Sequence, residues 1–299
     1  MNNLKIALDW TPNINHIGFY VAQNKGFYAD LNINLEIIDT SIDNYKVTPA
    51  KKVELGIVDF ALCPIESIIS YRRKSTPFPL IAIGALLQDD LSAICVKRKS
   101  TILSPKDLDH KTYSSYQARY EDGIVKEMIK YDGGSGEFNI IYPNKLGIWD
   151  NLIQDQSDAT WIFLNWEGIE ATEKGYDLRY FKLNDYGIPY SYSPVIAANE
   201  LKVEMNHETY RNFLEATKQG FLYCQEHQKE STAILSKYVL KKDKHIDLQK
   251  ALAYSAPHFG NKFIWGKMVP KRVIEFLDWL EQKGLEKDKL EFSDVARIL

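Results

Sequence analysis

Residues 5–16 read Lys-Ile-Ala-Leu-Asp-Trp-Thr-Pro-Asn-Ile-Asn-His, and this stretch indicates the fold class. Its first four residues form an apolar run typical of a short buried strand. A polar loop follows, and then the apolar spacing of residues 18–24 predicts a helix. The chain therefore opens with a strand, a loop and a helix, which is the repeating unit of mostly parallel sheets.

The same alternation continues along the chain in two series. In the first series, apolar runs predict strands at 35–38, 55–62 and 80–87, with helices at 49–53 and 65–73. After a polar segment at 88–90, the second series has predicted strands at 93–96, 139–142, 158–163 and 178–181, and a helix at 123–131. An α/β protein with two lobes is the expected fold class.

The strand predicted at 195–198 is expected to return to the first sheet. The first lobe would then comprise residues 1–89 and 195–299, and the second lobe residues 90–194, joined by a two-stranded hinge. From residue 206 onward apolar residues recur at helical spacing, so these C-terminal helices are expected to cover the first lobe. A length of 299 residues suits two lobes of ordinary size.

Composition excludes several classes of function. The 37 basic and 40 acidic residues give a net charge of −3 without a basic stripe, which argues against nucleic acid as a partner. The three cysteines are scattered and the histidines lack metal-ligand spacing, so no metal site is expected. No segment is apolar over the roughly 18 residues that a membrane span needs.

The N-terminal segment lacks the apolar core of an export signal, because a charged Asp9 closes its apolar run. A chain that begins naturally at Met1 is therefore expected in the cytoplasm. A chain from which a leader was removed is expected in the periplasm or outside the cell.

The loop after the first strand is the first candidate binding segment. Asp9, Trp10, Asn13 and His16 bring a carboxylate, an aromatic ring, an amide and an imidazole into eight residues. Ligands of open α/β sheets lie beyond the carboxyl ends of the strands, where this loop must lie. The alternative is that Asn13 forms a turn and that Trp10 belongs to the core.

The second candidate segment is Asn165-Trp166-Glu167-Gly168, which follows the strand at 158–163. A flat heteroaromatic ring needs apolar faces for stacking and polar groups at its edge, and Trp166 and Glu167 can supply them. A carboxylate suits an aminopyrimidine, since it accepts a hydrogen bond from the exocyclic amine. Alternatively, Glu167 lies in the first turn of a helix, where the helix dipole favours it.

These motifs carry a resemblance to a known family. The patterns Leu-Asp-Trp-x-Pro-Asn-x-Asn-His-x-Gly, Asn-Trp-Glu-Gly and Asn-Asp-Tyr-Gly-Ile-Pro, the last at 184–189 with Tyr186, resemble the NMT1/THI5-like family, which has an SsuA/THI5-like domain. The resemblance implies the type II periplasmic-binding-protein fold. The family includes ThiY-type proteins that bind formylaminopyrimidine and synthases that make the thiamine pyrimidine phosphate.

The resemblance is nearer to the binding branch. The synthases use a lysine that holds pyridoxal phosphate, a nearby histidine and a cysteine-rich segment that binds iron. This chain has Cys-Pro-Ile-Glu-Ser at 63–67 and Gly-Ile-Pro-Tyr-Ser-Tyr-Ser at 187–193 instead, so no catalytic residue and no cofactor is expected. Glu66, Tyr190 and Tyr192 resemble groups that line the pyrimidine slot; a helix cap and core packing are the alternatives.

Ser115 and Tyr116 precede the helix predicted at 123–131, and in the synthases the corresponding loop holds a phosphate. A serine-rich helix entrance can bind an anion through free backbone amides. Ordinary capping by the serines is the alternative. The glycine-rich run at 132–136 is interpreted as a turn.

The expected function is the binding of a thiamine pyrimidine precursor, of formylaminopyrimidine or hydroxymethylpyrimidine type, in the cleft between the lobes. Closure of the lobes would follow from contacts to both of them. An ABC transporter permease is a possible partner. The rivals are a cytoplasmic THI5-like synthase or related thiamine-biosynthesis enzyme, a cytoplasmic sensor or carrier, and a transporter component for another small ligand.

Overall fold

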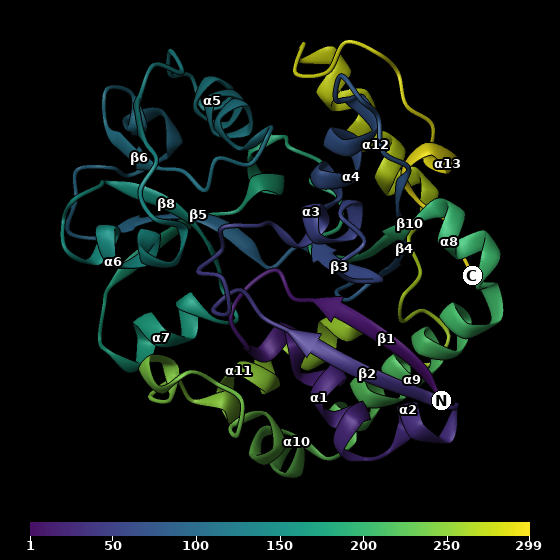
Figure 1. Ribbon diagram of the computed structural model, residues 1–299. Coiled ribbons are helices and arrows are strands. Elements are labelled where there is room, and N and C mark those ends of the chain that lie inside the picture. The colour runs from purple at the N-terminus through teal and green to yellow at the C-terminus, as the bar shows by residue number, and fades with distance from the viewer. The chain divides into compact units, whose positions relative to one another are not determined.

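The computed structural model describes all 299 residues and divides them into two compact units. Unit 1 comprises Met1–Asp90, Tyr192–Pro270 and Glu291–Leu299, and unit 2 comprises Leu91–Ser191 and Lys271–Leu290. Each unit contains one five-stranded sheet covered by helices (Figure 1). The α/β class expected from the alternation of strands and helices is therefore confirmed.

The sheet of unit 1 has the strand order β2-β1-β3-β10-β4. Its strands are β1 (Asn2–Ala7), β2 (Ile33–Ile38), β3 (Phe60–Cys63), β4 (Leu80–Ala85) and β10 (Val195–Asn199). Strand β1 runs parallel to β2 and β3, whereas β10 lies antiparallel between β3 and β4. The strand expected to return late in the chain therefore does pair within the first sheet. The carboxyl ends of β1, β2 and β3 share one edge, so the loops that follow them are neighbours.

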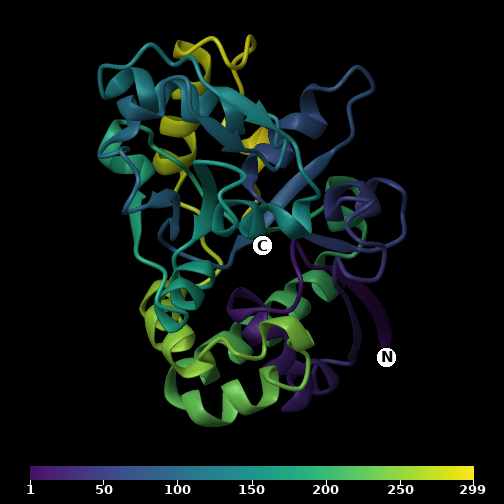
Figure 2. The same ribbon diagram turned by 90° about the vertical axis from the view of Figure 1, so that its left-hand side faces the viewer.

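The helices of unit 1 bury an aromatic core against this sheet. They are α1 (Ile17–Asn24), α2 (Phe27–Asp30), α3 (Pro49–Glu54), α4 (Ile65–Arg73), α8 (Glu200–Met205), α9 (His207–Glu226), α10 (Gln228–Leu235), α11 (Leu248–Ser255) and α13 (Phe292–Val295). Helices α1, α10 and α11 lie together, with the green helices beside the purple one in Figure 2. Phe213 of α9 stacks on Phe60 of β3 with ring centroids 4.0 Å apart. Burial of such rings, together with the aliphatic side chains around them, stabilises this unit.

Helices α1 and α9 approach so closely that a glycine is required at their contact. A Cβ atom on Gly220 would lie 2.1 Å from the backbone oxygen of Gly18. No side chain fits between the two helices at that point. Helix α1 directly follows the loop after β1, so its close packing on α9 holds this loop against the core. The position of this loop is thus fixed by tertiary packing.

The sheet of unit 2 has the order β7-β6-β8-β5-β9. Its strands are β5 (Ser92–Lys97), β6 (Thr112–Ser114), β7 (Asn139–Ile141), β8 (Ala159–Phe163) and β9 (Leu178–Phe181), and its helices are α5 (Glu121–Tyr131), α6 (Ile148–Ile153), α7 (Glu167–Glu173) and most of α12 (Pro270–Gln282). Strand β6 is parallel to β7 and β8, and β5 is antiparallel to β8 and β9. The strand β6 has only three residues and was not predicted from the sequence.

Two details differ from the expected organisation. The strand expected at 55–62 begins only at Phe60, because Gly56 adopts a positive φ of 69° and ends α3. In addition, residues 271–290 belong to unit 2 rather than to the first lobe. Phe276 of α12 packs on Tyr190 of that unit, so burial of an aromatic face groups this helix with unit 2. No helix of the chain is both long and apolar enough to cross a membrane.

Candidate functional site

The loop after β1 holds a carboxylate and a buried histidine in contact. His16 Nε2 lies 2.7 Å from Asp9 Oδ1, and the His16 side chain is fully buried while that of Asp9 is 19% exposed. The other ring nitrogen, Nδ1, accepts a hydrogen bond from the backbone amide of Asn13 at 3.2 Å. A neutral imidazole matches this geometry, since it accepts at Nδ1 and donates to the carboxylate from Nε2. His16 therefore holds Asp9 in place through Oδ1, while the Asp9 side chain stays partly exposed.

Asn13 shapes the same loop. Its side-chain oxygen accepts a hydrogen bond from the backbone amide of Asn15 at 2.9 Å, and it caps the short helix Ile14–His16. The side chain is buried. These contacts agree with the alternative that Asn13 forms a turn. Because the Asn13 amide also holds the His16 ring that contacts Asp9, they help to fix the direction in which Asp9 points.

Trp10 supplies a partly exposed aromatic face beside Asp9. Its ring lies 5.9 Å from the ring of Tyr45, at an interplanar angle of 58°. Tyr45 comes from the loop after β2 and adopts a positive φ of 59°, a conformation that non-glycine residues rarely adopt. Burial raises the pKa of the Tyr45 hydroxyl, and the charge of Asp9 adds to this effect. The sequence analysis did not identify Tyr45 as a candidate. The only signal in the sequence was its position in the loop after a strand of a parallel sheet.

The end of a third strand, β3, brings a carboxyl group and a thiol group to the same region. Glu66 lies in the first turn of α4, directly after β3, and is buried. Burial raises the pKa of the Cys63 thiol, and the charges of Asp9 and Glu66 act in the same direction. These electrostatic couplings indicate that the ends of β1, β2 and β3 form one cluster, which we call the unit 1 cluster: Asp9, Trp10, His16, Tyr45, Cys63 and Glu66.

Tyr192 lies in the core of unit 1. It is 1% exposed, and its hydroxyl oxygen accepts a hydrogen bond from the backbone amide of Val269 at 2.9 Å. Its backbone oxygen accepts from the amide of Ile65 at the start of α4. These contacts agree with the alternative that Tyr192 packs in the core.

Trp166 and Glu167 begin α7 in unit 2. The carboxylate of Glu167 accepts a hydrogen bond from the backbone amide of Phe163 at 3.0 Å, and Trp166 is only 4% exposed. Burial raises the pKa of the Cys95 thiol, with a further contribution from the charge of Glu167. The carboxyl group of Glu167 thus lies at the end of β8, and the ring of Trp166 is buried.

Aromatic rings of unit 2 gather around Tyr190. Its ring lies 5.3 Å from Trp161 of β8 and 5.4 Å from Phe276 of α12. Tyr186 lies apart from this group and contacts Phe181 edge-on, with ring centroids 6.1 Å apart. Trp161 is a further candidate that the sequence analysis did not single out, although it precedes the Asn-Trp-Glu-Gly motif by only four residues.

Ser115 and Tyr116 lie between β6 and α5, where an anion site was considered. The amide of Tyr116 donates to Glu121 Oε1 at 3.0 Å, and Ser115 Oγ accepts from the amide of Gln117 at 3.0 Å. The amides of this helix entrance are therefore engaged by side chains of the chain itself.

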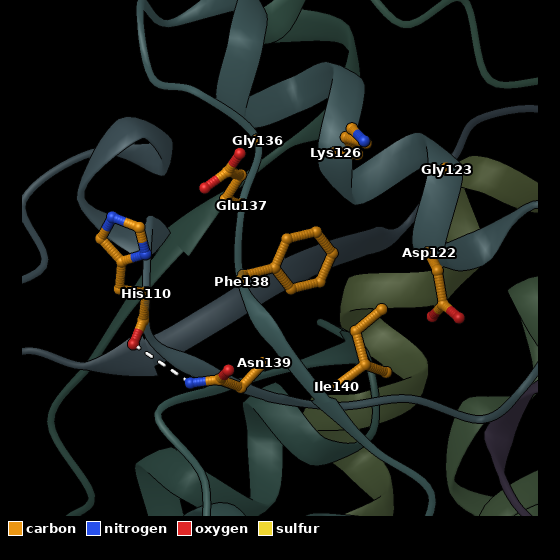
Figure 3. A pocket seen from close by; sticks show the side chains of 9 residues that line it. All are labelled: His110, Asp122, Gly123, Lys126, Gly136, Glu137, Phe138, Asn139 and Ile140. Carbon is orange, nitrogen blue, oxygen red and sulfur yellow. Dashed lines mark hydrogen bonds between the residues drawn. The ribbon is translucent and has the colours of Figure 1, made fainter.

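A separate hollow of about 500 Å³ lies between β7 and α5 (Figure 3). It is lined by His110, Asp122, Gly123, Lys126, Gly136, Glu137, Phe138, Asn139 and Ile140. Phe138 lies near its middle, with Glu137 and Lys126 on the upper side of the view and Asp122 on the right. None of the candidate residues named from the sequence lines this hollow, so it is distinct from the unit 1 cluster.

Comparison with known families and proteins supports the resemblance. The model of the family described as NMT1/THI5 like matches residues 13–231. A Haemophilus influenzae protein whose name assigns it to thiamine biosynthesis is 27% identical over 98% of this chain and 91% of its own length. The formylaminopyrimidine-binding protein of Halalkalibacterium halodurans is 23% identical over 99% of this chain and 91% of its length.

Three further similarities concern a synthase and the fold. The 4-amino-5-hydroxymethyl-2-methylpyrimidine phosphate synthase of Candida albicans is 23% identical over 95% of this chain and 91% of its own length. Among solved structures, the alkanesulfonate-binding protein SsuA of Xanthomonas axonopodis has a TM-score of 0.73 at 11% identity, covering 100% of this chain and 99% of that one. A ligand-binding component of an ABC-type import system from Staphylococcus aureus has a TM-score of 0.72 at 14% identity, covering 100% and 97%. The fold is therefore that of periplasmic binding proteins.

Proposed function

Because this chain belongs to the NMT1/THI5-like family, we propose that it binds a thiamine pyrimidine precursor of the formylaminopyrimidine or hydroxymethylpyrimidine type. The observation that carries this proposal is the 2.7 Å contact between His16 and Asp9 beside the partly exposed ring of Trp10. Two relatives similar over nearly the whole chain are named for thiamine biosynthesis and for formylaminopyrimidine binding. Their names support the same ligand class here.

The chemistry of the unit 1 cluster suits an aminopyrimidine. Asp9 Oδ1 is engaged by His16, so Oδ2 is the oxygen that accepts from the exocyclic amine of the ligand. Trp10 and Tyr45 lie at a tilt to each other, and a flat ring can stack on either face they present. Glu66 adds a second carboxyl group to the cluster, which favours a ligand that donates hydrogen bonds.

Unit 2 supplies a second group of candidate contacts. Tyr190 and Trp161 offer aromatic surface, and Glu167 offers a carboxylate at the end of β8. We propose these residues, with Ser115, Tyr116, Trp166 and Tyr186, as the contribution of unit 2 to binding. Asn13 and Tyr192 support the ligand contacts of unit 1 through the loop and the core.

Titration calorimetry with formylaminopyrimidine and hydroxymethylpyrimidine tests this function. Micromolar or tighter binding, about −8 kcal/mol, is expected for at least one of them. Asp9→Asn keeps the hydrogen bond to His16 but removes the charge, and it should weaken binding at least tenfold. Asp150→Asn, which alters an exposed carboxylate of α6 in unit 2, is the matched control and should leave affinity unchanged. Failure of both pyrimidines to bind the folded protein would exclude the proposal.

A transport role is the favoured context of this binding. Solved proteins with the same fold include a component of an ABC-type import system, so a transporter permease is the proposed partner. Delivery to a permease requires location outside the cytoplasmic membrane. A pyrimidine sensor or carrier within the cell would bind the same ligand, and fractionation of the native host separates the two cases.

A further inference from the structure

Lys52 is a buried lysine of unit 1 that pairs with an acid from another element. It lies in α3 and is only 6% exposed, although Lys51, its neighbour in the same helix, is exposed. Its Nζ atom lies 3.0 Å from Oδ2 of Asp43, which belongs to the loop after β2. A buried ammonium group needs such a partner, because an unpaired charge is costly to remove from water. The ion pair therefore fastens the loop after β2 to α3.

The loop that contains Asp43 has an uncommon backbone. Asn44 and Tyr45, the two residues after Asp43, both lie in the left-handed region, with φ of 53° and 59°. Residues other than glycine rarely adopt this conformation, and they keep it only where surrounding contacts enforce it. The Tyr45 amide donates to the Thr40 oxygen at 2.9 Å, and the Lys46 amide donates to the Asp43 oxygen at 3.1 Å. The segment is thus a tight turn that begins at the acid bound by α3.

The position of the Asp43 side chain depends on Lys52. Its Oδ1 atom is buried and has no hydrogen-bond partner, so its contact with Lys52 through Oδ2 holds the side chain. The side chain as a whole is 24% exposed, which gives the carboxylate a route to water once the ammonium group is removed. Loss of Lys52 should therefore release the carboxylate to solvent and loosen the turn that contains Tyr45.

Tyr45 links this local geometry to the candidate site. Its ring lies 5.9 Å from that of Trp10, and both rings belong to the unit 1 cluster. We propose that Lys52 is a positioning residue for pyrimidine binding, which holds Tyr45 beside Trp10 through its ion pair and so keeps the stacking surface formed before the ligand arrives. A preformed surface spares the ligand the cost of ordering it. This inference rests on the proposed pyrimidine function and adds a residue that acts without touching the ligand.

Amide hydrogen exchange followed by NMR tests the positioning without a ligand. In Lys52→Met the amides of Tyr45 and Lys46 should exchange at least tenfold faster than in the natural protein, because the turn opens more often. Lys51→Met removes the exposed lysine next to it, which pairs with a residue of its own helix, and as the matched control it should leave both rates unchanged. Unchanged exchange in a folded Lys52→Met protein contradicts the proposal. If that variant does not fold, Asp43→Ala breaks the pair from its partly exposed side and should give the same acceleration; unchanged rates there contradict the proposal equally.

A double-mutant cycle measured by calorimetry tests whether Lys52 acts through Tyr45. Tyr45→Ala and Lys52→Met should each weaken pyrimidine binding about tenfold, and the double variant should also lose about tenfold, since both changes remove the same ring from the site. A loss of about one hundredfold in the double variant means that the two residues act independently, and it overturns the proposal, as does natural affinity in Lys52→Met. If the natural protein binds no pyrimidine at all, the pyrimidine function is refuted instead, and the exchange rates still decide whether Lys52 holds the turn.

Discussion

His16 Nε2 lies 2.7 Å from Asp9 Oδ1, and the histidine is completely buried whereas the aspartate keeps contact with solvent. The pair joins the core of unit 1 to the surface on which a ligand is proposed to bind. Because His16 also accepts from the Asn13 amide, its ring cannot turn without losing a buried hydrogen bond. Asp9 is therefore presented in one orientation, which lowers the entropic cost of binding.

Removal of this support should weaken ligand binding without removing the binding carboxylate. His16→Ala leaves the Asn13 amide without its acceptor and is expected to cost about 1–3 kcal/mol of stability. Pyrimidine affinity should fall about tenfold, which corresponds to roughly 1.4 kcal/mol. Chemical unfolding and calorimetry measure the two effects. His207→Ala, at an exposed position of unit 1, is the control, and equal losses in both variants would contradict the role of His16.

The aromatic face of Trp10 should contribute through stacking. Trp10→Ala removes the ring that lies 5.9 Å from Tyr45, and the expected loss of binding is about 0.5–1.5 kcal/mol, or roughly 2- to 13-fold in affinity. Trp10→Phe should recover part of it. Phe263→Ala removes a ring that is 68% exposed in the same unit and should have no effect. Unchanged calorimetric affinity for Trp10→Ala would show that the ligand does not stack there.

The three cysteines should behave as core residues rather than nucleophiles. All of them are buried, and burial raises the pKa of each thiol, to about 12 for Cys224. At pH 8 the thiolate fraction of Cys224 is then on the order of one part in ten thousand. A chromogenic disulfide reagent should titrate no thiol rapidly in the folded protein and three in urea. Rapid reaction of one thiol before unfolding would point to an activated cysteine.

Asp109 should stabilise the glycine-rich turn in a pH-dependent manner. Its carboxylate accepts from the amides of Ser135, Gly136 and Glu137. Partial burial opposes ionisation, but these donors together lower the pKa of Asp109 below its ordinary value. A lowered pKa in the folded state gives stability that is complete above the unfolded pKa of about 4 and is lost as pH falls through the folded value.

The urea midpoint of Asp109→Asn should therefore lie below that of the natural protein at pH 7, and the gap should narrow as pH falls from about 4 toward 2. Asp185→Asn, at an exposed aspartate to which no backbone amide donates, should show no such change of the gap with pH. A gap for Asp109→Asn that stays constant between pH 7 and pH 2 would contradict the role of the three amides.

The sequence alone determined the class of fold and the family. Alternation of apolar runs and helical spacing predicted most strands of both sheets and several helices, because these patterns depend on local periodicity; the three-residue strand β6 was too short to give such a pattern. The helix expected at 65–73 is α4 at Ile65–Arg73, and the strand expected at 178–181 is β9 at Leu178–Phe181. The strand expected at 55–62 began too early, since a glycine that ends a helix resembles one within an apolar run.

Only the tertiary structure decided which side chains share a site. Tyr45 lies 35 residues beyond Trp10 in sequence, and parallel pairing of β1 with β2 brings their loops together. The contacts of Glu121 gave no signal in sequence, because they depend on a carboxylate that turns back onto the amides of Tyr116 and Ala118. Periodicity specifies elements locally, whereas hydrogen bonds between distant or back-folded groups arise only when packing fixes their positions in space.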